Sequence, residues 1–225
     1  SAPTLGKYGG EDDVFTLLTR DEGVTWYGWE NVSIGPYDYQ MNTLGMFKDN
    51  AAYYHVVFAI DSSQATASNR LKVYVNGVLQ TSFTDITYPS SQNQNMSINE
   101  GNPTYVTIGR QYGASNYFDG LMSHVHWIDG TQYAASDFGE TDATTGEWKI
   151  KTAPSVTYGT NGFFILKDGN SVTDQSGQSN NLAVASGTLT NTLDNPSNNY
   201  CTWNVLHAQT VGMTTIGNGN TYLAT

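Results

Sequence analysis

The chain has 225 residues, a length typical of one all-β domain, and its composition excludes several classes of protein. Nine Lys and Arg residues against 20 Asp and Glu give a net charge of −11, which argues against binding to nucleic acid or to anionic membranes. No stretch of about 18 apolar residues is present, so no membrane-spanning helix is predicted. One cysteine, Cys201, excludes a disulfide within this sequence and a cysteine-rich metal site.

Short runs of Val, Ile, Tyr, Phe and Thr alternate with turn-forming pairs such as Gly35-Pro36 and Asp129-Gly130. This spacing predicts an all-β fold, an antiparallel β-sandwich or barrel with little helix. One helical turn is predicted at 134–138. In chain order, the predicted strands are 53–60, which is nearly all apolar and therefore central, the arms of a hairpin at 70–83, then 105–109, 117–128, 162–166 and 181–185.

The hairpin at 70–83 carries the clearest local signal. Asn76-Gly77 between two β-branched arms predicts a type I′ turn, because both central positions of that turn need a positive φ. Alternation along the first arm places Leu71, Val73 and Val75 on one face, with Lys72 and Tyr74 on the other.

Three histidines fall on predicted strands. His124 and His126 are two residues apart and share a face, which suits a metal site, although no third ligand is evident. The alternative is a pair of histidines on a half-exposed sheet face. His55, within an apolar run, is predicted to be a sheet histidine with its hydrogen bonds satisfied.

The sequence offers little catalytic chemistry, and we expect no enzyme. Nucleophile-elbow and phosphate-loop motifs are absent. Glu140-Thr-Asp142 is spaced like the carboxylates of sandwich-fold glucanases, but the third carboxylate is missing, and a solvated loop explains the pair equally well.

Two further segments are candidate binding sites. Asp168, Asn170 and Asp174 form an oxygen-rich loop that suits Ca²⁺, although Asx turns explain the same residues without metal; no other cofactor is expected. The aromatic segment (Trp26, Tyr27, Trp29, Tyr37 and Tyr39) is dense in side chains that stack on sugar rings, and the alternative is core packing or a subunit interface.

Several motifs occur together: a Tyr-His strand, the run DSSQATASNR, a Val-Asn-Gly hairpin, the strand FDGLMSHVHWIDG and the loop DFGETD. As a set, over about residues 44–204, they resemble the concanavalin A-like (laminin-G-like) domain of virion structural proteins from marine and cyanobacterial tailed phages. The resemblance implies a sandwich of two antiparallel sheets and a place in a virion, with no catalytic residues.

From the residues and the resemblance together, we expect three parts: a poorly matched N-terminal β segment at 1–43, the sandwich at 44–209 and a C-terminal arm at 210–225. The arm has few charges and many small residues, so it is expected to lie along a partner's sheet edge. The expected partners are other virion proteins, further copies of this chain and a host-surface polysaccharide, with no nucleic acid and no membrane insertion. A free carbohydrate-binding or adhesion module and a sandwich-fold glycoside hydrolase are the alternatives.

Overall fold

The described part of the chain is mostly antiparallel strand. Its helical segments are α1, Ala135–Phe138, and the 3-10 turn η1, Ala67–Asn69. Among the described residues, no helix is long and apolar enough to cross a membrane. The all-β class and the helical turn near residue 134 are confirmed. The computed structural model describes residues 12–20, 33–34, 40–45, 52–94, 108–109, 118, 121–167, 171–185, 187–191, 196, 215–217 and 222–224.

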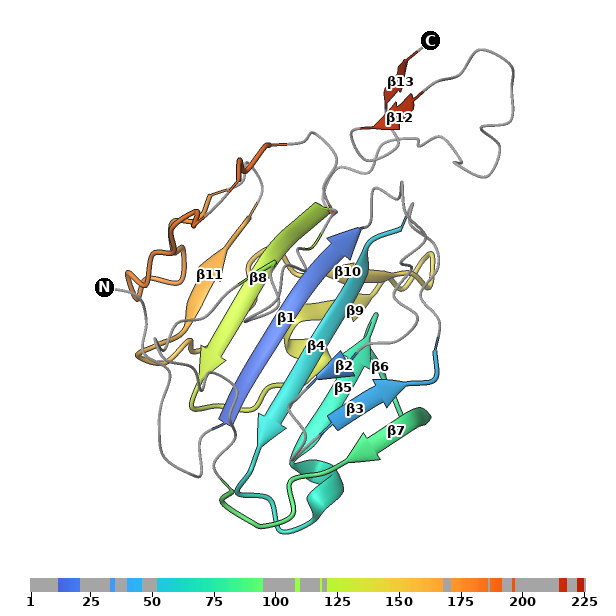
Figure 1. The fold of residues 1–225 in the computed structure, drawn as a ribbon, viewed down its shortest axis with the longest axis vertical. Helices are drawn as coiled ribbons and strands as arrows, with labels where there is room; N and C mark the ends of the chain where they lie inside the picture. Colours follow the sequence, from blue (N-terminus) through green and yellow to red (C-terminus); the bar gives the residue numbers. More distant parts are fainter. Residues whose placement is uncertain are drawn as a thin grey trace.

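A six-stranded sheet forms the centre of the molecule, and all its neighbouring strands are antiparallel (Figure 1). The strands, in spatial order, are β11 (Phe163–Ile165), β8 (Leu121–Asp129), β1 (Asp12–Arg20), β4 (Tyr54–Asp61), β5 (Leu71–Val75) and β6 (Val78–Leu79). β1 comes from the N-terminal 43 residues and lies between β4 and β8. The sheet therefore contains strands from both sides of residue 44. The division of the chain into parts at that residue stays a prediction.

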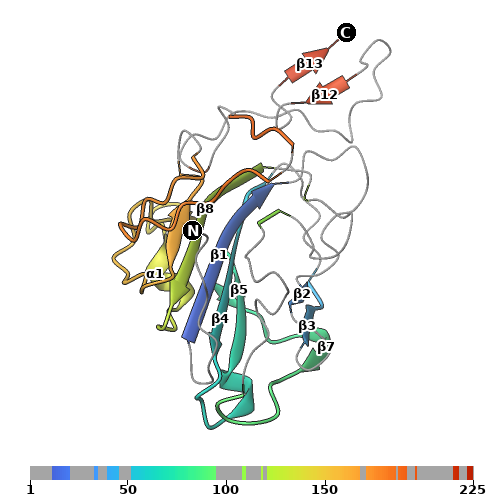
Figure 2. The ribbon, with the colours of Figure 1, turned by 60° about the vertical axis from the view of Figure 1, so that its left-hand side comes forward.

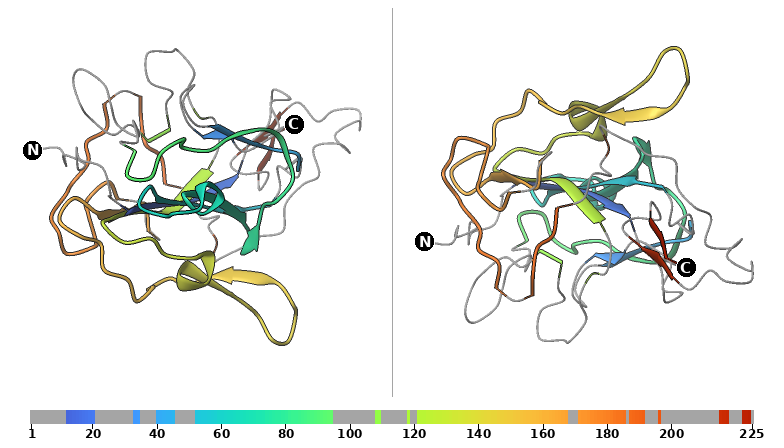
Figure 3. Two further views of the ribbon diagram at one scale, coloured as in Figure 1. Left: turned by 90° about the horizontal axis from the view of Figure 1, so that it is seen from below. Right: turned by 90° about the horizontal axis from the view of Figure 1, so that it is seen from above.

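Different elements cover the two faces of this sheet (Figures 2 and 3). On one side lies a three-stranded sheet of β2 (Ser33–Ile34), β3 (Gln40–Thr43) and β7 (Phe83–Thr87). On the other side lie α1 and the hairpin of β9 (Gly139–Thr141) and β10 (Trp148–Ile150). The packing of the main sheet on a second antiparallel sheet is what the predicted sandwich requires, and α1 with β9–β10 adds a further layer on the other face.

The face toward β2–β3–β7 is the aliphatic face. Alternate residues of β4 and β5 point into it, because successive side chains of a strand lie on opposite sides. Phe58, Phe83 and Ile86 are partly buried against the same cluster. Its buried members are Met41, Val56, Ile60, Leu71, Val73 and Val75.

The predicted hairpin is confirmed as β5 and β6. Asn76 and Gly77 have φ values of 46° and 79°, the positive values that a type I′ turn needs. The burial of β5 alternates as predicted, with Leu71 fully buried and Lys72 half-buried.

Most of the other predicted strands are present. β4, β8 and β11 occupy 54–61, 121–129 and 163–165, and β4 is an interior strand. The prediction of a strand at 181–185 is wrong. That segment is held by separate bonds instead, from Asp174 N–H to Asn181 Oδ1 (2.8 Å) and from Leu182 N–H to the Val172 carbonyl (3.0 Å). Of the strand predicted at 105–109, only 108–109 are described.

The C-terminal arm contains a small hairpin of β12 (Thr215–Gly217) and β13 (Tyr222–Ala224). The two strands pair antiparallel, with Ile216 opposite Leu223. Among the described strands they pair only with each other. Figures 1 and 2 show this C-terminal hairpin beyond the upper end of the main sheet.

Candidate functional site

The residues predicted to bind ligands fall mainly outside the described part of the chain. This holds for the whole aromatic segment (Trp26, Tyr27, Trp29, Tyr37 and Tyr39) and for Asp168 and Asn170. Glycan binding by the aromatic segment stays a prediction, and so does the calcium site. Asp174 is described, and its surroundings show what that carboxylate does in the structure.

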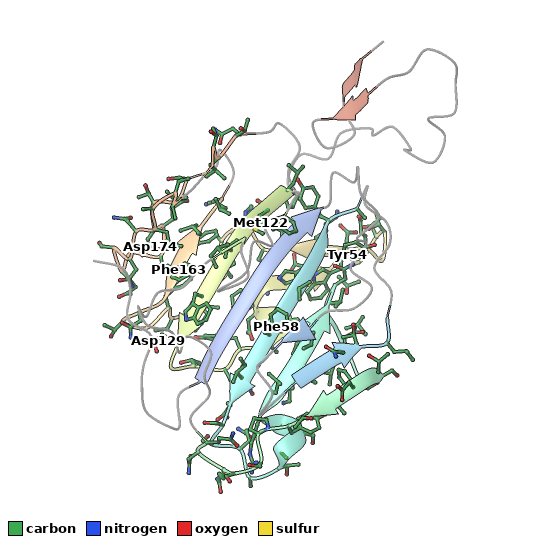
Figure 4. All side chains as sticks on the ribbon, viewed as in Figure 1. Tyr54, Phe58, Met122, Asp129, Phe163 and Asp174 are labelled. Atoms are coloured by element: carbon green, nitrogen blue, oxygen red, sulfur yellow. The ribbon has the colours of Figure 1, made fainter. Side chains whose placement is uncertain are left out.

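Asp174 anchors the loop beside β11 (Figure 4). Its Oδ1 accepts hydrogen bonds from the N–H groups of Phe164 and Ser176, each at 2.8 Å, and its Oδ2 accepts from Ser176 Oγ (2.8 Å) and Asn180 N–H (2.9 Å). Burial opposes ionisation of Asp174, but these donors outweigh it and lower the pKa. Four donors occupy the lone pairs that a cation would need, which is the Asx-turn arrangement.

Other carboxylates of the described residues hold loops in the same way. Asp61, at the end of β4, accepts from the backbone N–H of Ser63 (2.9 Å) and from its hydroxyl (2.6 Å). Asp129, at the end of β8, accepts from the backbone and side-chain nitrogens of Asn161, both at 2.9 Å. Asp137 caps α1 by accepting from Ala134 N–H at 2.8 Å. These carboxylates therefore fix the connections between strands.

The most distinctive polar feature lies on the face of the main sheet that α1 and β9–β10 cover. We call it the histidine cluster, and it consists of His55, Ser123, His124, His126, Trp148 and Tyr158. β4 supplies His55 and β8 supplies His124 and His126. The three imidazoles are only 2–3% exposed. The prediction that His124 and His126 lie on a half-exposed face is therefore wrong, because the second layer seals this side of the sheet.

His55 is held from two directions, and its prediction as a satisfied sheet histidine is confirmed. Trp148 Nε1 donates to His55 Nδ1 at 3.0 Å, and the two rings stack with centroids 6.0 Å apart. The backbone N–H of His55 donates to Asn76 Oδ1 at 2.8 Å. Trp148 also packs on the hairpin turn so closely that a Cβ at Gly77 would lie 2.3 Å from the indole. The contact therefore requires glycine at position 77.

His124 and His126 lie where β8 departs from a regular ladder. His124 has a φ of 51°, and the pairing of β1 with β8 shifts register across this point, as at a β-bulge. Both rings contact Phe164, which stacks on His126 at a centroid distance of 4.0 Å. His126 Nδ1 is hydrogen-bonded to the Tyr158 hydroxyl at 2.8 Å, and His124 Nδ1 to Ser123 Oγ at 2.7 Å.

Burial controls the ionisation of the cluster. Desolvation, with a smaller contribution from His124, lowers the pKa of His55 to about 4. Desolvation and the neighbouring histidines also hold the pKa of His126 well below its usual range. Burial, assisted by the charge of Asp174, raises the pKa of the Tyr158 hydroxyl. His55 and His126 are therefore neutral near pH 7.

The cluster is built for packing and hydrogen bonding within the core. Its imidazoles are buried, so a substrate does not reach them in this conformation. No group of three or more His, Cys, Asp or Glu side chains in the described ranges is arranged to hold a metal ion. The metal interpretation of His124 and His126 finds no third ligand there.

The carboxylate pair Glu140 and Asp142, which has glycosidase-like spacing, lies on the outside of the β9–β10 hairpin. Asp142 Oδ2 is 2.7 Å from Lys149 Nζ, and Oδ1 accepts from the N–H groups of Thr144 and Thr145. The hydrogen bond from Lys149, followed by those from Thr145 and Thr144, lowers the pKa of Asp142. A general acid for glycoside hydrolysis needs a raised pKa, so Asp142 is unsuited to that role.

Sequence reasoning found the three histidines but missed Trp148 and Tyr158, which complete the cluster. Trp148 begins the three-residue strand β10 and Tyr158 lies in an irregular segment, and both stretches are too short for periodicity to indicate burial. The sequence nevertheless carried a signal of the histidines' burial. His55 and His126 are each two residues from a buried residue of the same strand, Val57 and Ile128, and therefore lie on the same face. A polar residue at a core position needs a partner, and a buried tryptophan or tyrosine needs one for its own N–H or O–H.

Comparison with known proteins bears on the fold. Searches of curated proteins and of solved structures each found no match. One family model, described as the concanavalin A-like lectin/glucanases superfamily, matches residues 4–136, more than half of the sequence. This range begins well before residue 44, where the sequence resemblance starts, and it includes β1. With its antiparallel layers and almost no helix, the chain belongs to the concanavalin A-like lectin/glucanase superfamily.

Proposed function

We propose that this domain is a non-enzymatic structural protein of a phage virion that also binds host-surface glycans. The concanavalin A-like fold is compatible with carbohydrate binding. The virion setting is supported by the sequence resemblance over about residues 44–204. A fibre, an appendage and a capsid decoration all suit a rigid domain of this kind, and its partners there are other virion proteins and further copies of the chain.

The arrangement of the described carboxylates carries the non-enzymatic part of the proposal. Asp61, Asp129, Asp137 and Asp174 each accept hydrogen bonds that hold a loop or a helix end. Asp142 is paired with Lys149 and has a lowered pKa. A glycosidase requires two carboxyl groups whose pKa values are shifted in opposite directions. The described carboxylates instead hold the connections between strands in place, as expected of a scaffold.

The aromatic segment supplies the proposed glycan contact. Tryptophan and tyrosine rings present rigid, amphipathic area at a low cost in conformational entropy. A net charge of −11 repels acidic polysaccharides, so the proposed ligand is neutral or is bridged by a cation. Each stack contributes about 1 kcal/mol, so that one domain binds weakly and many copies on a particle supply avidity.

Glycan binding is tested by replacing Trp29 and Tyr37 with alanine, singly and together. The variants and wild type are compared on a glycan array of neutral and acidic polysaccharides and in adsorption to host cells, with circular dichroism as the check on folding. Val184→Ala is the control, because Val184 is an exposed apolar residue remote in sequence from the segment. We expect the double variant to lose binding while the control keeps it. Folded variants that bind as wild type does would refute a role for this segment.

The virion setting is tested separately by mass spectrometry and immunogold labelling of purified particles. Presence at a fixed position on the particle supports the structural role. Glycan binding by a protein absent from particles would instead favour the alternative of a free carbohydrate-binding or adhesion module. Release of reducing ends from a laminarin or alginate panel would favour a hydrolase and overturn the non-enzymatic assignment.

A further inference from the structure

The C-terminal hairpin is a β-structure that lacks a supporting layer among the described elements. β12 and β13 form a separate two-stranded sheet, and none of the other described strands continues it. Figures 1 and 2 show it apart from the main sheet. A two-stranded hairpin is marginally stable in water by itself, because it needs a third strand or a packed face. An added surface would therefore stabilise it.

The main sheet offers such a surface at its β6 edge, which is apolar and exposed. Val78 and Leu79 make up β6, and their side chains are 64% and 41% exposed. Leu44, which is 59% exposed, donates its backbone N–H to the Ser82 carbonyl in the connection that follows β6. These three residues are among the few large apolar side chains that the described part of the molecule leaves in solvent.

The backbone of β6 is also open to a new strand. Val75 pairs with Val78 and Tyr74 with Leu79, while Gln80 N–H donates to the Val73 carbonyl at 2.8 Å. Hydrogen-bonded and non-hydrogen-bonded pairs alternate along an antiparallel ladder, so Leu79 occupies a non-hydrogen-bonded position opposite Tyr74. Its N–H and C=O therefore point away from β5, toward the open edge. An incoming strand can bond to them.

The C-terminal arm and the β6 edge are both uncharged, whereas the protein as a whole is acidic and repels its own copies. The chain carries a net charge of −11, but residues 210–225 contain no Asp, Glu, Lys or Arg, and neither do residues 73–82. A neutral arm that meets a neutral edge brings two acidic molecules together without setting like charges against each other.

We propose that the C-terminal hairpin of one copy adds to the β6 edge of a second copy and covers Val78 and Leu79. The inference deepens the proposed structural role, on which it rests for its setting, by naming the two surfaces that join the copies. The contact is heterologous, because the donor and acceptor surfaces differ. It closes into a ring or a reciprocal dimer if the rotation between copies allows, and otherwise propagates as a filament.

The first test measures self-association by sedimentation velocity over a range of concentrations. Wild type is compared with Val78→Lys, with a chain lacking residues 210–225, and with the control Val184→Lys. Val184 is 50% exposed, and its replacement changes the net charge by the same amount as Val78→Lys. We expect the edge variant and the truncated chain to associate at least about tenfold more weakly than wild type, while the control associates normally. Thermal melts confirm that all four proteins are folded.

The second test identifies the contact itself by disulfide formation between separately prepared chains. In a Cys201→Ser background, one chain carries Leu79→Cys and the other Leu223→Cys. Mixing them under mild oxidation should give the mixed dimer in large excess over either self-linked dimer, and Val78→Lys in the acceptor chain should reduce its yield.

Three outcomes would overturn the proposal. The first is a wild-type chain that stays monomeric at every concentration. The second is an association that survives both the edge substitution and the truncation. The third is a chain carrying both cysteines that forms only the internal disulfide, which would place the hairpin on its own sheet. None of them affects particle location or glycan binding, so failure here is distinguishable from failure of the proposed function.

Discussion

The two faces of the six-stranded sheet solve the same packing problem with different chemistry. Toward β2–β3–β7 the buried side chains of β4 and β5 are aliphatic, and they include Leu71, Val73 and Ile60. Toward α1 and β9–β10 it mixes Val57 and Ile128 with His126, Tyr158 and the Trp148–His55 pair. The aliphatic face depends on shape alone, whereas the histidine face also depends on the protonation state of buried groups.

This difference teaches that burial by itself does not determine how a core responds to its surroundings. An aliphatic cluster responds to lost volume and is insensitive to pH. A cluster held by neutral imidazoles responds to acid, because a proton on His55 Nδ1 removes the acceptor for Trp148 and places a charge in a sealed layer. The experiments below separate the two responses.

The largest effect is expected from a cavity in the aliphatic face. Leu71 is fully buried between the sheets, so Leu71→Ala should lower the free energy of unfolding by about 2–5 kcal/mol. The loss should be the same at pH 7.5 and at pH 5, because the cluster and the side chains packed on it include no residue type that ordinarily titrates between these pH values. Urea denaturation at both pH values measures it, and a loss confined to one pH would contradict the separation of the faces.

Acid should weaken the histidine face by a similar amount. His55 has a folded pKa of about 4, below the ordinary value of 6.5, so the unfolded chain binds more protons between these two values. Its contribution is complete above pH 6.5 and is lost as the pH falls toward 4. The loss is about 3 kcal/mol for His55, and His126 adds to it.

His55→Asn is the matched variant for this experiment. Its amide oxygen replaces Nδ1 as an acceptor for Trp148 but does not titrate. Between pH 6.5 and pH 4 the unfolding free energy of this variant should therefore fall less steeply than that of wild type. Equal slopes would show that His55 titrates normally in the folded state.

A smaller effect is expected from removing one hydrogen bond of the histidine face. Trp148→Phe keeps an aromatic ring against His55 and Gly77 but removes the indole donor, which should cost about 1–2 kcal/mol at pH 7.5. Without that donor, protonation of Nδ1 costs less, so the pKa of His55 should rise toward its ordinary value. Imidazole chemical shifts followed by NMR across the pH range measure this change, and an unaltered His55 titration would contradict it.

The smallest effect is expected on the outer side of the same layer. Lys149→Met removes the ion pair with Asp142, where both side chains are in contact with solvent. Exposed pairs contribute little, because water and salt screen them. The thermal midpoint should stay within the spread of replicate wild-type melts in both low and high salt. A clear shift would show that the ion pair, and not only the interior contacts, holds β9–β10 on the sheet.

The parts of the fold that follow local patterns were predictable from sequence. The β5–β6 hairpin follows from Asn76-Gly77 and from alternation, and β4 follows from its apolar run. β1 was not singled out, because no local feature of 12–20 indicates that it inserts between β4 and β8. The bulge at His124 depends on the pairing of β8 with β1, so it too is a product of tertiary structure.

The candidate site was predicted less completely for a related reason. The three histidines stand out as residue types, but the hydrogen-bond partners of His55 and His126 are Trp148 and Tyr158, which lie 93 and 32 residues away from them. The strand predicted at 181–185 failed because side-chain bonds from Asp174 and its neighbours replaced a ladder. The alternation of apolar and polar residues in a sequence does not distinguish an extended segment held by side-chain hydrogen bonds from one held in a β-ladder.

The position of β1 also sets the order in which the domain can be built during synthesis. Asp13 pairs with Ile60 on one side and with Asp129 on the other, so the second pairing spans more than half of the chain. Until β8 has left the ribosome, β1 can pair only with β4 and keeps one edge exposed. The nascent chain therefore carries an open edge while the next 70 or so residues after β4 are translated. Chaperone engagement or misassembly of the growing chain would act within that interval.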